Sequence, residues 1–173
     1  MGHKEHKHLA PKSVAVVLVT VSTSRDVSGD RSGDVMVELM QSHGHDILKR
    51  MLIKDGLDSV RQCLEEEARD ERVQAVIFSG GTGVSSQDLT IEAISPLVQA
   101  WLPGFGELFR RLSYDSIGTP AIMSRAGAAV CTVPGRPGRI LVVALPGSPN
   151  AVRLALEEVL LPELGHIVYE INR

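Results

Sequence analysis

A glycine-rich stretch followed by a carboxylate carries the clearest chemical signal in this chain. It reads Ser79-Gly80-Gly81-Thr82-Gly83 and is followed by Asp88. Successive backbone N–H groups in such a turn can form a concavity that binds an anion, and glycines let the main chain approach a ligand closely. A carboxylate beside a phosphate can hold a magnesium ion. The stretch predicts a magnesium-phosphate site, although a tight strand-to-helix turn also needs glycine.

Three further polar loops follow apolar segments that we predict to be buried strands. Asp30 belongs to the loop at 22–34, Asp55 to Lys54-Asp55-Gly56, and Ser148 to the loop at 145–150. In a doubly wound sheet, the loops at the carboxyl ends of the strands line the ligand crevice. We therefore expect these side chains to lie near the glycine-rich stretch, although the chemistry of turns explains many single loop aspartates.

Covalent catalysis is a poor match to the residue pattern. The glycine-rich stretch lacks the lysine of a Walker P-loop, and no dinucleotide fingerprint follows the first predicted strand. His166 is the only histidine in the second half of the chain, which argues against a Ser/His/Asp arrangement. The expected mechanism is positioning of substrates with neutralisation of charge by a metal ion.

Strand-like and helix-like patterns alternate along the chain and would position these loops. This alternation predicts a three-layer α/β/α fold with a mostly parallel sheet and helices on both faces. The turn at 134–138 predicts a small β-hairpin between two of the strands. Thr90 is a candidate helix N-cap, and 101–107 is predicted to be irregular. The predicted strands are 13–21, 46–53, 73–78, 121–125, 128–133 and 139–145. The predicted helices are 35–43, 59–68, 91–95, 108–116 and, as the final helix, 151–161.

Length and composition limit the class of protein. The 173 residues favour a polar tail at 1–12, which contains His3, His6 and His8, and a single domain at 13–173. A net charge of −3 and an aromatic content of 3% argue against nucleic acid as a partner. No apolar run is long enough for a membrane span, and two distant cysteines without metal-ligand spacing suggest a reduced, cytoplasmic protein.

Several motifs together resemble the MoaB/MogA molybdenum cofactor biosynthesis family, which includes the G domain of gephyrin and its plant counterpart. The resemblance covers Val14–Val168 and rests on five stretches: Asp30-Arg31-Ser32-Gly33, Ser79-Gly80-Gly81-Thr82-Gly83, Asp88-Leu89-Thr90, Pro103-Gly104-Phe105-Gly106-Glu107 and Leu145-Pro146-Gly147-Ser148-Pro149. It implies a three-layer α/β fold and a molybdopterin adenylyltransferase that joins molybdopterin to AMP from Mg-ATP and releases pyrophosphate. It also implies a homo-oligomer, trimeric or hexameric, that passes its product to the metal-inserting enzyme.

The same resemblance implies roles for individual residues. Asp55 and Asp88 would be catalytic and would hold Mg²⁺, and Ser79 with Gly80–Gly83 would bind the nucleotide phosphates. The implied substrate-binding residues are Asp30, Ser32, Gly33, Glu107, Ser124, Pro146, Gly147 and Ser148. Two carboxylates within reach of one metal should raise each other's pKa when the metal is absent.

The chain departs from the family pattern at two places, which keeps alternatives open. Gln87 stands where many members have a basic residue, and Lys54-Asp55-Gly56 replaces a loop with two acids. Lys54 and Arg31 are the candidates to compensate for these changes. One alternative is a non-catalytic molybdopterin-binding or carrier protein of the MoaB branch. A scaffold and a CinA-type protein acting on nicotinamide compounds rank lower. The retained Asp55 and Asp88 favour the enzyme.

A group of apolar residues at 97–109 suggests a surface for assembly. Trp101, Leu102, Phe105 and Phe109 lie close together in a stretch with few charges. An exposed apolar surface on a small domain usually marks an interface. We therefore expect this stretch to contribute to the oligomer.

Overall fold

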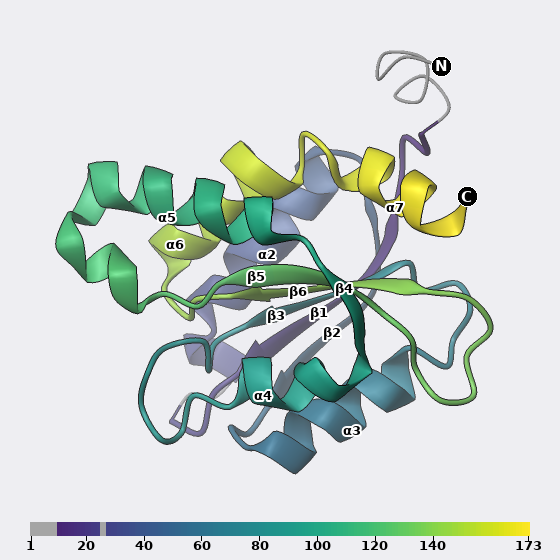
Figure 1. Cartoon of the computed structure of the whole chain (residues 1–173), viewed down its shortest axis with the longest axis horizontal. Helices are drawn as coiled ribbons and strands as arrows, with labels where there is room; N and C mark the ends of the chain where they lie inside the picture. The colour runs from purple at the N-terminus through teal and green to yellow at the C-terminus, as the bar shows by residue number, and fades with distance from the viewer. Residues whose placement is uncertain (1–9, 25–26) are drawn as a thin grey trace.

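The computed structural model describes residues 10–24 and 27–173, so most of the predicted polar tail, with His3, His6 and His8, lies outside the described residues. A six-stranded sheet in the order β2-β1-β3-β6-β5-β4 forms the middle layer (Figure 1). Its strands are β1 (Ala15–Val21), β2 (Asp46–Ile53), β3 (Ala75–Ser79), β4 (Val98–Trp101), β5 (Gly127–Cys131) and β6 (Ile140–Leu145).

Four strands of the sheet run parallel. β1 pairs in parallel with both β2 and β3, and β3 pairs in parallel with β6. Their carboxyl ends consequently meet at one edge of the sheet. β1 lies between β2 and β3, so the two strands that follow β1 in the sequence pair with it on opposite sides. β5 runs antiparallel to β6, which confirms the predicted hairpin, and β4 pairs antiparallel with β5.

Helices cover both faces of the sheet, which confirms the three-layer prediction (Figure 1). One face carries α2 (Arg31–Ser42), α5 (Pro103–Ile117), α6 (Pro149–Leu154) and α7 (Leu164–Asn172), and the other carries α3 (Leu57–Glu67) and α4 (Thr90–Ile94). The side chains of β1 alternate between the faces, so that Val16 and Leu18 enter one apolar core while Val17 and Val19 enter the other. Shorter turns are η1 (Val27–Gly29), η2 (Ser95–Leu97), η3 (Thr119–Met123) and the π-helix η4 (Ala155–Leu160).

Four local predictions were wrong. The stretch 121–125 is not a strand, because η3 occupies it after Gly118 and Pro120. The stretch 101–107 is not irregular: β4 ends at Trp101, and α5 begins at Pro103, a residue suited to the first helical turn. The helix predicted at 151–161 is not the last, since α7 follows it.

Thr90 is the fourth correction, because it is not an N-cap. Leu89 occupies the cap position of α4 without a side-chain hydrogen bond. The hydroxyl of Thr90 instead donates a 2.8 Å hydrogen bond to the carbonyl oxygen of Gly80. Thr90 thus holds the glycine-rich turn against the start of α4.

Within the described ranges, no helix is long and apolar enough to cross a membrane.

Candidate active site

A cavity of about 420 Å³ lies at the edge where the carboxyl ends of the four parallel strands meet. Each of these strands contributes residues to it through the loop that follows, as the sequence predicted. Its lining consists of Val21, Ser22, Ser24, Asp55, Gly80, Gly81, Thr82, Gly83, Asp88, Ser124, Pro146, Gly147 and Ser148. The topology therefore brings Asp55, Asp88 and the glycine-rich turn to one place.

Five of the predicted site residues do not line this cavity. Ser79 is fully buried beneath it, and its hydroxyl donates a 3.1 Å hydrogen bond to the carbonyl of Pro146. Glu107 is exposed on α5 and lines a separate surface cavity with Tyr114 and Ile122. The remaining three, Asp30, Ser32 and Gly33, belong to the start of α2.

Asp30 has the contacts of a buried helix cap. It is 1% exposed, and its carboxylate accepts hydrogen bonds from Gly33 N at 2.9 Å and from Thr20 Oγ1 at 2.9 Å. Arg50 forms a 3.0 Å ion pair with it. Burial alone would raise the pKa of Asp30, but the bonds from Gly33, Arg50 and Thr20 outweigh burial and lower it. These contacts account for Asp30 without a ligand.

The glycine-rich turn has a backbone that requires glycine at two positions. Gly80 has φ +114° and Gly81 has φ +65°. A Cβ at Gly80 would collide with the carbonyl oxygen of Val21, and one at Gly81 would collide with the hydroxyl of Thr90. Among the described residues, the N–H groups of Gly81 and Thr82 have no hydrogen-bond acceptor. Two such N–H groups in the lining of a cavity suit an anionic oxygen.

Asp88 is fixed by its own loop. Its Oδ2 accepts a 2.8 Å hydrogen bond from Ser85 N. Burial would raise the pKa of Asp88, but hydrogen bonds from Ser85 and Gly83 and the charge of Arg125 outweigh burial and lower it. The expectation that the paired carboxylates would raise its pKa was therefore wrong. The reason is that local N–H donors stabilise the charged form.

One carboxylate oxygen of Asp55 accepts hydrogen bonds, and the other has no donor among the described residues. Its Oδ2 accepts hydrogen bonds from Thr23 N at 2.5 Å and Thr23 Oγ1 at 2.7 Å. No described residue donates to its Oδ1. The described residues hold no cluster of three metal-binding side chains, so a cation here would draw its remaining ligands from a substrate or water.

The cavity is acidic in its side chains. Within residues 10–24 and 27–173, two carboxylates line it and no lysine, arginine or histidine does. Lys54 and Arg31, the two candidates to compensate for the altered motifs, are exposed and lie outside the lining. An anionic substrate would therefore meet two negative charges unless a cation accompanies it.

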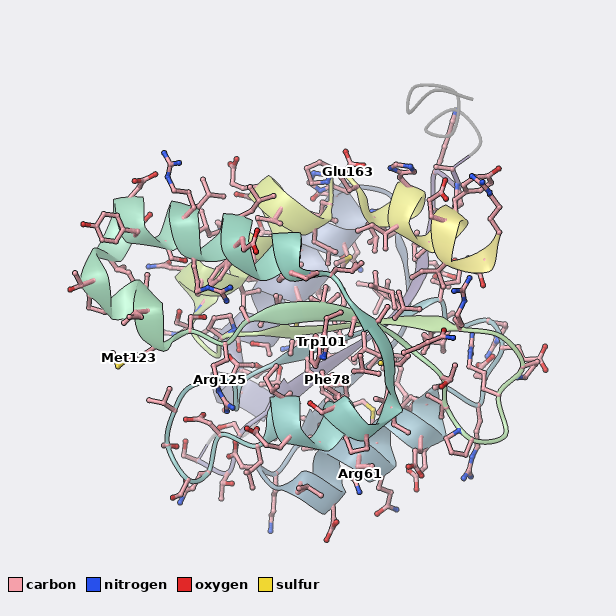
Figure 2. All side chains as sticks on the ribbon, in the orientation of Figure 1. Arg61, Phe78, Trp101, Met123, Arg125 and Glu163 are labelled. Carbon is pink, nitrogen blue, oxygen red and sulfur yellow. The ribbon has the colours of Figure 1, made fainter. Side chains whose placement is uncertain are left out.

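Arg125 is the residue that sequence reasoning missed. Its guanidinium donates to the carbonyl oxygens of Gly83 at 2.6 Å and of Asp88 at 2.7 Å, and it pairs with Glu92. In Figure 2, Arg125 lies where the end of η3 approaches α4. Its position directly after the predicted site residue Ser124 is the only sequence signal that could have suggested it.

The predicted assembly surface is mostly core. Phe105 and Phe109 are 7% and 1% exposed, because α5 turns them into the apolar core beside the sheet. Trp101 remains 40% exposed at the edge strand β4 (Figure 2). Apart from Val84, the other large apolar side chains that are exposed among the described residues lie further along, on α5 and η3: Leu108, Tyr114, Ile117, Ile122 and Met123.

Comparisons with known proteins agree with the observed fold. The family model of a probable molybdopterin binding domain matches residues 17–166. A molybdenum cofactor biosynthesis protein B from Bacillus cereus is 42% identical over 174 residues, which cover 100% of this chain and 99% of that protein. The crystal structure of a molybdenum cofactor biosynthesis protein B has a TM-score of 0.85 at 42% identity, covering 94% of this chain and 98% of that one. The tungsten cofactor synthesizing protein MoaB from Pyrococcus furiosus has a TM-score of 0.82 at 32% identity, covering 95% and 100%.

Proposed function

The chain belongs to the MoaB/MogA family of molybdopterin-binding domains and to molybdenum cofactor biosynthesis, and from this premise we propose that it adenylylates molybdopterin. In this reaction a phosphate oxygen of molybdopterin attacks the α-phosphorus of ATP. The bond from the α-phosphorus to the bridging oxygen breaks, and pyrophosphate leaves. The adenylylated product would pass to the enzyme that inserts the metal.

The observation that carries this proposal is the composition of the 420 Å³ cavity. It combines the free N–H groups of Gly81 and Thr82 with the carboxylates of Asp55 and Asp88. N–H groups held by a rigid turn stabilise the charge that builds up on phosphate oxygens during transfer. Thr90 and Arg125 fix that turn before any substrate binds.

The carboxylates fit a magnesium ion brought in by ATP. Asp55 retains a free Oδ1, and the contacts of Asp88 favour its charged form. Oxygen ligands from one or two carboxylates, completed by substrate phosphates and water, are typical of Mg²⁺ in proteins. When bound, the ion would neutralise charge on the triphosphate and on departing pyrophosphate. This requirement is stronger here because no described basic side chain lines the cavity.

A carrier of molybdopterin without catalysis is the second candidate. Two observations favour the carrier. No described basic side chain lines the cavity, and Gln87, which replaces the basic residue of many family members, is exposed. A carrier would bind molybdopterin through the N–H groups of the turn and would gain little from Mg-ATP.

The test is a pyrophosphate-release assay with purified protein, molybdopterin and Mg-ATP. The enzyme should release pyrophosphate and form adenylylated molybdopterin only when both substrates and Mg²⁺ are present. Replacing Mg²⁺ by EDTA should abolish release. Molybdopterin binding without any release of pyrophosphate would reject the enzyme and support the carrier.

A further inference from the structure

The loops that follow β1 and β2 leave the sheet side by side. Val21 and Ile53 are paired at the ends of these parallel strands, and Ser22 N continues the pairing with a 2.9 Å hydrogen bond to the carbonyl oxygen of Ile53. Thr23 and Asp55 each lie two residues beyond this last strand pair. The register of the strands therefore brings a threonine of one loop to the candidate cation ligand of the other.

Thr23 and Asp55 bind each other reciprocally. Oδ2 of Asp55 accepts hydrogen bonds from Thr23 N at 2.5 Å and from Thr23 Oγ1 at 2.7 Å. The backbone N–H of Asp55 in turn donates to Thr23 Oγ1 at 3.3 Å. Each carboxylate oxygen has about two lone-pair sites, so these two donors occupy those of Oδ2. Rotation of the carboxylate would break both bonds, and Oδ1 is consequently the oxygen that stays available.

The backbone on the other side of Asp55 is also fixed. Ser59, in the first turn of α3, donates a 2.8 Å hydrogen bond from its hydroxyl to the carbonyl oxygen of Lys54. Gly56, the N-cap of α3, has φ +143°, a conformation that favours glycine. Residue 55 is thus held between β2 and α3, and the main freedom left to it is rotation of its side chain. The hydrogen bonds from Thr23 restrict that rotation.

Thr23 can influence the candidate active site through Asp55 alone. It is exposed and is not part of the cavity lining, although Ser22 and Ser24 on either side of it are. An exposed site admits water when a hydroxyl is removed, so the loss leaves no buried polar group unpaired and should change stability little. An effect of the Thr23 hydroxyl on ligand binding must therefore pass through Asp55.

We propose that Thr23 is a positioning residue that holds Asp55 so that Oδ1 is the oxygen presented to the cation of a Mg-nucleotide. The proposal rests on the proposed function in one respect, namely that Asp55 is a ligand of this cation. Mg²⁺ in proteins keeps several waters and takes oxygens from only one or two carboxylates, so a single oxygen from Asp55 suffices. A side chain that is already fixed loses less freedom on binding, which raises the affinity for the cation and its nucleotide.

The test measures binding of Mg-ATP to the full chain by calorimetry, without molybdopterin, so that no transfer occurs. Thr23→Val keeps the shape of the side chain and removes the hydroxyl, and it should weaken binding by about threefold to tenfold, the range for one hydrogen bond. Thr23→Ser retains the hydroxyl and should bind as the wild type does. Thr132→Val is the matched control, because Thr132 is exposed directly after β5, at the opposite edge of the sheet. All variants should melt at the wild-type temperature.

A double-variant cycle separates positioning from a general effect on the loop. In Asp55→Asn, which already lacks the charged ligand, Thr23→Val should have no further effect. An equal loss in both backgrounds would overturn the proposal, as would wild-type affinity in Thr23→Val or in Asp55→Asn, or no saturable binding by the wild type. If Asp55→Asn binds too weakly to measure, Thr23→Ser decides, since an affinity as low as that of Thr23→Val would reject a role for the hydroxyl.

Pyrophosphate release is measured separately, so that the two proposals can fail independently. No release, with the affinity differences intact, would reject adenylylation and leave Thr23 as the positioning residue of a Mg-nucleotide site. Release by the wild type, with unchanged Mg-ATP affinity in Thr23→Val, would leave adenylylation in place and reject the role of Thr23.

Discussion

Arg125 Nε donates a 2.6 Å hydrogen bond to the carbonyl oxygen of Gly83, which ties the glycine-rich turn to a residue 42 positions later. The same side chain donates to the carbonyl of Asp88 at 2.7 Å, and its own backbone N–H donates to Thr82 O at 3.1 Å. One residue thus holds three carbonyls of the segment 82–88. With its carbonyls fixed in this way, the turn can keep its N–H groups in place for a ligand.

Replacing Arg125 should therefore loosen the turn. We expect Arg125→Ala to weaken Mg-ATP binding by about tenfold and to lower the free energy of unfolding by about 1–3 kcal/mol, because carbonyls lose their donors. Arg125→Lys should recover little, since one ammonium cannot replace a planar fork that serves two carbonyls and Glu92. Calorimetry measures the affinity.

Hydrogen exchange distinguishes positioning from general destabilisation. Arg125→Ala should raise exchange in 82–88 while the central strands remain protected. Arg110→Ala is the matched control, because its guanidinium makes only a 3.5 Å contact with Ser124 O. Unchanged exchange and unchanged affinity in Arg125→Ala would show that the turn does not depend on this residue.

Asp30 should matter for stability rather than for the reaction. Asp30→Ala removes the acceptor of Gly33 N and the partner of Arg50 and is expected to lower the free energy of unfolding by about 2–3 kcal/mol. Asp30→Asn keeps an acceptor for the cap and should cost less. Thermal melts compare the variants, and turnover of the folded protein should remain near wild type. A large rise in the KM for molybdopterin in Asp30→Ala, with unchanged stability, would instead show that Asp30 binds the substrate.

The sequence predicted the elements whose own residues show a clear hydrophobic pattern. The apolar run before the glycines indicated β3, and the bounds predicted for β2, Asp46–Ile53, are those observed. Because parallel strands share a carboxyl edge, the meeting of Asp55 and Asp88 followed from element order alone. The roles of Arg125 and Asp30 could not be predicted in this way. The sequence around an arginine or a loop aspartate looks the same whether the side chain binds a ligand or a distant part of the chain. Their roles depend on partners, Gly83 and Arg50, that only the folded chain brings to them.

His45 should make stability depend on pH. Its Nδ1 accepts a 3.2 Å hydrogen bond from Val14 N, which requires an unprotonated nitrogen. Burial, and then the charge of His43, lower the pKa of His45. The folded protein thus takes up this proton less readily than the unfolded chain, so the contribution is full above pH ~6.5 and is lost as the pH falls below it.

Melting temperature between pH 8 and 5, in roughly half-unit steps, measures this contribution. His45→Gln, whose amide oxygen can accept from Val14 without titrating, should reduce the fall in melting temperature at acidic pH. His166→Gln is the control on α7. The same acid fall in wild type and His45→Gln would exclude His45 as the source.

We expect self-association through α5 and η3, where exposed apolar side chains gather. Ile122 is 83% exposed and Met123 is 51% exposed, and Figure 2 shows Met123 pointing away from the body of the protein. Such a surface favours association, and the family resemblance suggests a trimer or hexamer. Light scattering should show an oligomer for the wild type and smaller species for Ile122→Asp. Val84→Asp, at an exposed residue outside this surface, should behave as wild type; a monomeric wild type at micromolar concentration would contradict the prediction.

Asp88 should be required for AMP transfer. Asp88→Asn keeps the size of the side chain and an acceptor for Ser85 N, but it removes the charge, and a neutral amide is a poor magnesium ligand. The rate of AMP transfer should fall by about a hundredfold or more, the range for loss of one element of electrostatic stabilisation. Binding of molybdopterin should fall far less than the rate, because the N–H groups of Gly81 and Thr82 remain available to its phosphate.

Asp55→Asn should have a similar effect, and the double variant should be less than additive, because loss of either carboxylate already weakens the one metal site. Asp58→Asn, at an exposed position in the first turn of α3, is the matched control. Aspartates that only shape their loops would behave differently: their loss would lower the melting temperature and leave the turnover of folded protein intact. Melting temperature measured beside turnover separates these cases, and full activity of a folded Asp88→Asn protein would reject magnesium-assisted transfer at this site.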